Sequence, residues 1–246
     1  YTFNVAGAVN GAGSWVGTGT SRTNNGTGAL IIQNVANLGG LTIGKSTNTR
    51  AVQITNGITV AGDVNVYGGQ ITISGGQTVR STAGNVLLDA DVGSQLLFNG
   101  VGLQMGALSK VQASGDITIA GRGGSTTGNT GTELTGASLI AGGNLTVSGI
   151  TGLGNTLAVN IKSGSTLQAG GSISVTGLNQ SATSVTGPSG LQILSSSVSA
   201  GGALNLTGQS SLGNTYGILL FDSSLSTSPS AAGAGPITLT ALSGNI

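Results

Sequence analysis

A short phrase, Ala141–Gly149 (AGGNLTVSG), returns in variant form along most of the chain, and this repeat constrains the fold more than any other feature. Successive copies are separated by 22 to 33 residues, measured between their anchor glycines. A period of this size with unequal insertions is typical of solenoids, whose coils share one element and vary their loops. The anchor glycines are Gly40, Gly62, Gly84, Gly115, Gly143, Gly171, Gly202 and Gly235.

Each copy alternates apolar and polar residues after its anchor glycine, which is the period of a strand with one buried face. The apolar pair is aliphatic in every copy: Leu41/Ile43, Val64/Val66, Val86/Leu88, Ile117/Ile119, Leu145/Val147, Ile173/Val175, Leu204/Leu206 and Ile237/Leu239. The residue between the two is mostly small, polar and uncharged: Thr42, Asn65, Leu87, Thr118, Thr146, Ser174, Asn205 and Thr238. We therefore expect one strand per coil with its aliphatic residues inside.

Two further strand-like pieces precede each copy. One begins four or five residues before the anchor glycine, at Val35, Ile58, Val79, Val111, Leu139, Leu167 and Val198. The other lies further upstream, at Leu30/Ile32, Val52/Ile54, Ile71/Ile73, Leu103/Met105, Leu157/Val159/Ile161, Leu191/Ile193 and Ile218/Leu220. Three short strands per turn predict an all-β protein, a parallel β-helix (β-solenoid) of about eight coils of 22–33 residues, and the rule for parallel crossovers makes it right-handed.

The repeat runs through nearly all of the 246 residues, so we predict a single elongated domain over 1–246. Residues 1–29 do not register on the repeat and are expected to form an N-terminal coil or cap. Three polar stretches, Gly121–Gly131, Gly177–Gly190 and Asp222–Gly235, are predicted to be loops that bulge from the rod. Gly244–Ile246 reads like the start of another strand, so we expect the chain to be an excised segment of a longer protein.

The charge balance and composition exclude several classes. Seven Lys and Arg against six Asp and Glu give a net charge of +1 without any basic stripe, which argues against nucleic-acid binding. No apolar run approaches the roughly 20 residues needed to span a bilayer, so no membrane span is expected. The 47 glycines follow no strict triplet, which excludes collagen. Cysteine is absent, so stability must come from stacking, and passage through a secretion pore is possible.

Catalysis is poorly supported, because the chain has no histidine and no cysteine to act as base or thiol nucleophile. Its carboxylates are scattered: Asp63, Asp89, Asp91, Asp116, Glu133 and Asp222. Asp63 and Asp116 share the position after the anchor glycine, with Asn85 between them and Asn144 beyond. These residues form either a carboxylate groove for polysaccharide or an Asx ladder whose side chains satisfy the backbone, and we favour the ladder. We predict no catalytic, metal or cofactor-binding residue, no cofactor and no enzyme.

Several other surface features have both a structural and a functional interpretation. The sequons at Asn25, Asn144, Asn179 and Asn205 are expected from composition, and a strand-face role is favoured over glycan attachment. The outward threonines raise the possibility of an ice-binding face, although Asn65, Leu87 and Asn205 interrupt them. Trp15 and Tyr67 could offer aromatic platforms to carbohydrate, but a packed end and an isolated surface ring are the simpler interpretations.

The phrases AGGNLTVSG, AGGSISVTG and AGGALNLTG resemble the hemagglutinin-type repeats of the filamentous hemagglutinin family, the two-partner secretion exoproteins of Gram-negative bacteria. The resemblance spans about Gly39 to the end, and autotransporter passenger domains use similar coils. It implies a right-handed shaft that is extracellular, displayed on or shed from the bacterial surface, with an outer-membrane secretion partner and a cell-surface or matrix receptor. The family's NPNG-type and NPNL secretion motifs have no counterpart here, and no family residue can be carried over because the repeat residues are structural.

Two functions from different classes follow. The first is the structural shaft of an adhesin or exoprotein that mediates adhesion, biofilm formation or cell–cell contact. The second is a self-assembling extracellular filament or sheath subunit, in which the ends Tyr1–Val5 and Gly244–Ile246 stack head to tail. A polysaccharide-active or ice-binding β-helix is a distant third.

Overall fold

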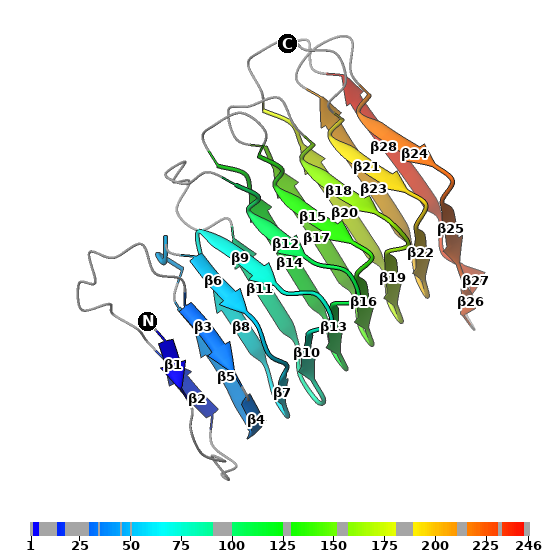
Figure 1. Cartoon of the computed structure of the whole chain (residues 1–246). Coiled ribbons are helices and arrows are strands. Elements are labelled where there is room, and N and C mark those ends of the chain that lie inside the picture. Colours follow the sequence, from blue (N-terminus) through cyan, green and yellow to red (C-terminus); the bar gives the residue numbers. More distant parts are fainter. Residues whose placement is uncertain are drawn as a thin grey trace.

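The chain forms a parallel β-solenoid of three sheets, whose coils stack in chain order from one end to the other (Figure 1). The computed structural model describes residues 2–4, 14–17, 30–33, 35–44, 46–49, 51–90, 100–124, 129–151, 157–180, 189–210, 216–230 and 233–243. Side chains are described from residue 39 onward within these ranges, except at residues 229, 230, 233 and 243. Within these ranges every regular element is a strand, and no helix is long and apolar enough to cross a membrane.

From β3 to β25 each coil contributes one strand to each sheet, so strands three apart in the chain are neighbours. At the two ends of the stack, β1 neighbours β3 and β23 neighbours β28. The first sheet has nine strands: β1 (Thr2–Asn4), β3 (Leu30–Gln33), β6 (Ala51–Ile54), β9 (Gln70–Ile73), β12 (Leu103–Met105), β15 (Thr132–Thr135), β18 (Val159–Lys162), β21 (Leu191–Leu194) and β24 (Ile218–Phe221). The second has eight: β4 (Val35–Leu38), β7 (Ile58–Val60), β10 (Thr78–Ser81), β13 (Lys110–Ala113), β16 (Ser138–Ala141), β19 (Thr166–Ala169), β22 (Ser197–Ala200) and β25 (Ser224–Thr227).

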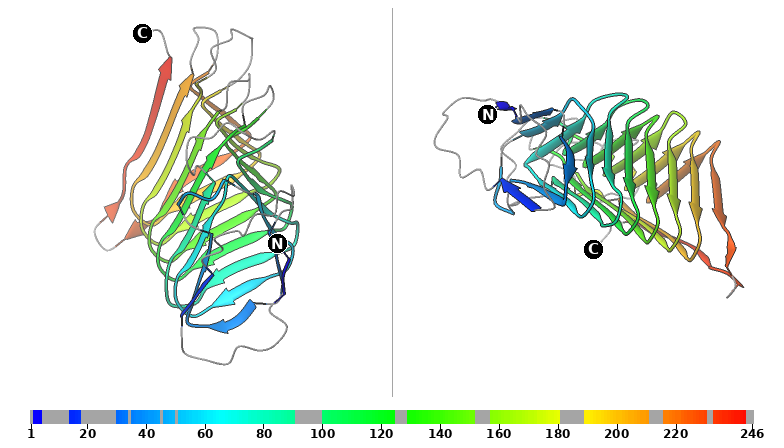
Figure 2. Two further views of the ribbon diagram at one scale, coloured as in Figure 1. Left: turned by 90° about the vertical axis from the view of Figure 1, so that its left-hand side faces the viewer. Right: turned by 90° about the horizontal axis from the view of Figure 1, so that it is seen from below.

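The third sheet contains the strands that follow the anchor glycines, and it wraps around the same core (Figure 2). Its nine strands are β2 (Ser14–Gly17), β5 (Gly40–Ile43), β8 (Val64–Tyr67), β11 (Val86–Ala90), β14 (Ile117–Arg122), β17 (Leu145–Ile150), β20 (Ile173–Leu178), β23 (Leu204–Ser210) and β28 (Ile237–Ser243). A two-stranded antiparallel hairpin, β26 (Pro229–Ser230) with β27 (Gly233–Ala234), lies between β25 and β28.

The register between coils confirms the alignment of the repeat. Leu145 of β17 pairs with Ile117 on one side and Ile173 on the other, and the same column continues from Leu41 to Ile237. Fourteen of the sixteen predicted inward residues are at most 3% exposed, and the two exceptions, Ile237 and Leu239, belong to the last coil. The alternating pattern therefore builds a continuous aliphatic column, as predicted.

The other two sheets supply their own columns to this core. Val79, Val111 and Leu139 of the second sheet pair in sequence and are fully buried. The alanines that close four of these strands, Ala113, Ala141, Ala169 and Ala200, are buried where the chain turns toward the third sheet. A small side chain there lets the corner stay tight.

The strands β15 and β2 were not predicted from the sequence. β15 has Thr132 where its neighbours in the column have Leu103 and Val159, so the apolar signal is missing. Thr132 is nevertheless fully buried, and its hydroxyl donates to the carbonyl oxygen of Ser148 at 2.6 Å. β2 places Trp15 in register with Leu41, so the N-terminal stretch that does not register on the repeat also contributes a strand to the stack.

The prediction of a loop over Asp222–Gly235 is wrong. This stretch contains β25, which pairs with β22 along its whole length and puts Leu225 beside Val198. Because Leu225 is the single apolar residue among serines and threonines, composition indicated a loop, whereas the ladder of the preceding coil is what holds the strand. In the other two predicted loops, residues 125–128 and 181–188 lie outside the described ranges, while Gly121–Arg122 and Gly177–Leu178 extend β14 and β20.

The inward and outward assignment can be tested on one strand. Val147 is fully buried in β17, whereas its neighbour Thr146 is exposed on the outer face. Val147→Asp should lower the free energy of unfolding by several kcal/mol, because it places an unpaired charge in the column. Thr146→Asp should change it by no more than about 0.5 kcal/mol. Thermal unfolding followed by circular dichroism measures both, and equal losses would contradict the assignment.

Candidate functional site: the Asx ladder

The residues singled out after the anchor glycines lie at one corner of the solenoid, between the second and third sheets. They form a continuous chain of hydrogen bonds across successive coils. The carboxylate Oδ1 of Asp63 accepts from the backbone N–H of Asn85 at 2.8 Å, and Asn85 Oδ1 accepts from the N–H of Asp116 at 2.8 Å. Asp116 Oδ1 accepts from Asn144 N–H at 2.6 Å, and Asn144 Oδ1 from Ser172 N–H at 2.9 Å.

The ladder ends when the residue type changes. Ser172 Oγ accepts from the backbone N–H of Ala203 at 3.1 Å, and Ala203 has no side-chain oxygen with which to continue. Each side chain therefore satisfies a donor at the start of the next coil's strand, where the sheet ladder has not yet begun. This confirms the Asx ladder among the two interpretations offered by the sequence.

The ladder also explains why the anchor position is glycine. A Cβ on Gly143 would meet Asp116 Oδ1, one on Gly115 would meet Asn85 Oδ1, and one on Gly171 would come within 2.5 Å of Asn144 Oδ1. The oxygen of the Asx side chain occupies the space that a side chain on the next glycine would need. The glycine and the polar residue that follows it thus act together, in the five coils from Gly62 to Ser172.

A second set of glycines, at the corner between the third and first sheets, was missed by the sequence reasoning. A Cβ on Gly149 would contact the carbonyl oxygen of Ala158, one on Gly177 that of Gly190, and one on Gly208 that of Gly217. The third-sheet strands run across the start of the first sheet here, and only glycine allows the two backbones to approach. Gly149, the last residue of the phrase AGGNLTVSG, was the sequence feature that could have indicated these close approaches.

The carboxylates do not converge into a site. Asp63 and Asp116 are two coils apart at the Asx corner, with Asn85 between them, and each uses one oxygen on the backbone. Asp89 lies on the third sheet between Tyr67 and Ala120, and Asp222 lies at the corner between the first and second sheets. Asp91 lies outside the described residues. Across the described parts of the chain, no group of three or more acidic residues could hold a metal ion.

Glu133 forms an ion pair on the first sheet. Its Oε1 lies 3.5 Å from Lys162 Nζ, across adjacent strands of the first sheet. The neighbouring Asn160, only 6% exposed, keeps a buried Oδ1 without a donor. Because that oxygen is covered, it cannot meet a ligand without rearrangement.

A shallow groove crosses three coils at the corner between the first and second sheets. It is lined by Gly164–Thr166, Ser195–Ser197 and Asp222–Ser224. Its inner hydroxyls are already used on the backbone: Ser165 Oγ donates to Lys162 O at 2.7 Å, and Ser196 Oγ donates to Leu194 O at 2.7 Å. The groove therefore results from tight turns that are held by hydrogen bonds from serine side chains to the backbone.

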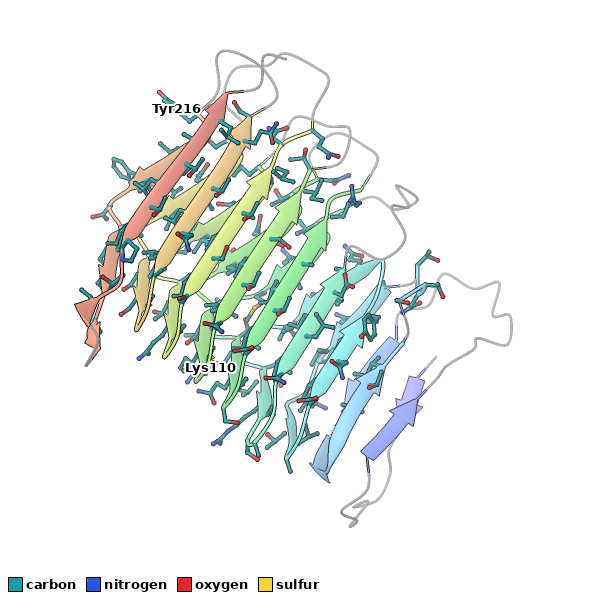
Figure 3. The ribbon with its side chains drawn as sticks, turned by 180° about the vertical axis from the view of Figure 1, so that it is seen from behind. Lys110 and Tyr216 are labelled. Atoms are coloured by element: carbon teal, nitrogen blue, oxygen red, sulfur yellow. The ribbon has the colours of Figure 1, made fainter. Side chains whose placement is uncertain are left out.

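The surface residues with alternative interpretations fall as follows. Asn144 belongs to the Asx ladder, and Asn205 is exposed on the outer face of β23. Asn179 is buried, at 4% exposure, while Asn25 lies outside the described residues. Tyr67 lies half-buried on the outer face of β8. Figure 3 shows Lys110 near the middle of the stack and Tyr216 on the last coil, along the opposite edge.

Comparison with known proteins adds no family. No protein-family model matches the chain, and neither a curated protein nor a solved structure does.

The structural role of the ladder can be separated from a role of the negative charge. The double variant Asp63→Asn, Asp116→Asn keeps both acceptor oxygens and should stay within about 0.5 kcal/mol of the parent in thermal unfolding. Asp116→Ala removes the acceptor for the N–H of Asn144 and should cost about 1 kcal/mol. A double variant that melts as low as Asp116→Ala would show that the charge itself matters.

The steric role of the anchor glycine can be tested against a backbone role. Gly143→Ala places a methyl group against Asp116 Oδ1 and should destabilise by more than about 1 kcal/mol, on the order of an overpacked site. Gly76 has φ +74 but no atom within 4 Å of the position that a Cβ would take, so Gly76→Ala should cost only the left-handed strain, about 1 kcal/mol. Urea unfolding of both variants gives the comparison, and a smaller loss for Gly143→Ala would contradict the steric account.

Proposed function

We propose that this chain is a structural shaft of a secreted bacterial surface exoprotein of the filamentous hemagglutinin type, which mediates adhesion, biofilm formation or cell–cell contact. The repeat phrases that resemble those of the family support the proposal, as does the lack of cysteine, which permits secretion of an unfolded chain. The shaft would be extracellular, exported through an outer-membrane partner, and would present its receptor-binding parts at a distance from the cell.

One observation carries this proposal: the polar residues that follow the anchor glycines form hydrogen bonds to the backbone of the next coil. The Asx oxygens bind the next coil's backbone, the anchor glycines make room for those oxygens, and the aliphatic columns fill the core. A surface built this way is uniform along the rod, which suits a spacer better than a receptor site. By the same reasoning we propose that the chain is not an enzyme.

The finer architecture belongs to the same proposal. We take one coil of 22–33 residues with three strands as the unit of construction, repeated about eight times and right-handed, as parallel crossovers prefer. Stability is then a sum of coils and their interfaces, so that length can change by whole units.

A whole coil should be removable. Deleting residues 145–172 joins Asn144 to Ile173, and Leu145 and Ile173 are counterparts one coil apart. The shortened chain should keep its β circular-dichroism signal and cooperative unfolding, because every remaining strand finds an equivalent neighbour. Deletion of residues 145–158 alone removes half a coil, breaks the register and should abolish cooperative unfolding.

The shaft role can be tested by measuring how far from the cell surface the rod places a binding domain. A known binding domain displayed on bacteria at the tip of this rod should capture target cells coated with a thick polymer layer, and capture should fall when residues 145–172 are deleted. The rod alone, displayed at equal density, is the control. Saturable binding of the rod alone to the target cells, or capture that does not depend on coil number, would contradict a passive shaft.

A further inference from the structure

Leu108 is an exposed leucine in a strained backbone conformation, at a turn between the first and second sheets. Its side chain is 76% exposed and its φ is +63. A left-handed conformation is unfavourable for leucine, because the Cβ lies too close to the following carbonyl oxygen. Among the side chains described between residues 39 and 215, no other large apolar one is exposed. A strained backbone that holds an apolar side chain in solvent indicates a contact beyond the single rod.

The neighbouring coils show that the turn itself does not require leucine. The counterparts of Leu108, two residues before the paired strands β10, β13 and β16, are Gly76 in the coil before and Gly136 in the coil after. Both glycines also have positive φ, +74 and +57. Gly76 N–H donates to the carbonyl oxygen of Ala107 at 2.9 Å, and Leu108 N–H donates to that of Gly136 at 2.8 Å. The turns therefore stack through their backbones, and Leu108 projects between two glycines as what we call the Leu108 knob.

The serine-lined groove lies at the same corner of the solenoid, three coils further along the rod. The Leu108 knob lies between β12 and β13, and the middle turn of the groove, Ser195–Ser197, follows β21. The groove encloses about 620 Å³, which is enough for a leucine side chain. Its inner hydroxyls tolerate an apolar occupant, because Ser165 and Ser196 already donate to backbone carbonyl oxygens. Leu108 and Ser195 each have a coil on both sides, so both features belong to the side of the rod.

We propose that the Leu108 knob of one copy of this chain inserts into the serine-lined groove of a second copy, with the two rods antiparallel. A two-fold axis perpendicular to the rods makes the contact twice, because the groove of the first copy receives Leu108 of the second. The knob and the middle of the groove are three strand spacings apart, roughly 14 Å, so the two contacts lie side by side. The axis passes between the turns at Gly136 and Gly164, where the absence of side chains lets the rods approach.

The charges beside the knob and in the groove are complementary. Lys110, two residues after Leu108, is exposed on the outer face of β13 near the middle of the stack (Figure 3). Asp222, which lines the groove, is also exposed and accepts from Ser195 Oγ at 3.3 Å. In the antiparallel arrangement the Lys110 ammonium of each copy comes near Asp222 of the other. Such an exposed pair adds little affinity but favours one register.

The contact belongs to the small and transient class, since each groove takes one large side chain. Antiparallel rods are the arrangement expected when two cells that carry the shaft face each other, so the contact would join such cells. That use rests on the proposed shaft role, whereas the contact itself does not. The purified chain tests the contact without any cell, and the display experiment above tests the shaft.

Sedimentation equilibrium of the purified chain measures the association. The parent should show a reversible equilibrium between monomer and dimer. Leu108→Gly removes the knob and relieves the left-handed strain, so the dissociation constant of the dimer should rise at least tenfold while the melting temperature stays at or above the parent's. Lys110→Glu should also raise the dissociation constant, by a factor that falls as salt is added. Leu87→Thr is the matched control, because it removes an outward leucine from the third sheet, and it should dimerise like the parent.

Disulfide trapping tests the register, in a chain that has no cysteine of its own. A mixture of Leu108→Cys and Ser195→Cys chains should give mainly the mixed disulfide dimer under mild oxidation. Each variant alone should give little dimer, because its two cysteines lie roughly 14 Å apart in the proposed pair. A disulfide spans Cα atoms no more than about 7 Å apart.

Three results would overturn the proposal. A parent that stays monomeric at high concentration would show that the groove takes no second copy. A Leu108→Gly chain that dimerises as strongly as the parent would show that the rods associate elsewhere. Disulfides that form mainly between identical cysteines would show that the rods do not pair in the antiparallel register.

Discussion

The parallel backbone ladder, which aligns each residue with its counterpart one coil away, determines most of the other features of this structure. It makes every position the member of a column, so a side chain must be compatible with its neighbours above and below. In the core this favours aliphatic residues, because each one can pack on the same kind of side chain in the coils before and after it. The column from Leu41 to Leu204 is an example. On the surface it disfavours charge, because like charges directly opposite each other are destabilising.

The few charged residues obey this constraint. Within the described strands, Arg80 lies between Thr59 and Gln112, Lys110 between Thr78 and Ser138, and Asp89 between Tyr67 and Ala120. At the Asx corner the two carboxylates alternate with amides, so one oxygen of each carboxylate accepts from an N–H of the next coil. A charged content of only 5% is then a consequence of stacking and does not indicate disorder.

The sequence predicted the fold well where one residue pattern had one structural meaning. Aliphatic alternation fixed the third sheet and most of the other two, because period 2 with one buried face has a single solution in a stacked strand. The Asx ladder was predictable for a similar reason, since a polar residue in the same place in four coils needs a common partner. By contrast, Thr132 in β15 and the serines around Leu225 in β25 form strands only because the neighbouring coil supplies their hydrogen bonds. That information is long-range, and no local pattern contains it.

The close approaches at the corners follow from the same geometry and bear on what a functional site would require. Where Gly149 passes Ala158, or Gly143 passes the Asp116 side chain, the backbone leaves no room for variation. A receptor site on such a rod must therefore be built from positions outside the columns and corners. A substitution within them would change the packing against the coil before and the coil after. The serine-lined corner at Ser195 and Asp222 illustrates the limit: it is concave, yet its inner hydroxyls already hold the turns together. Uniform stacking is therefore the reason that we propose a shaft and not a receptor site.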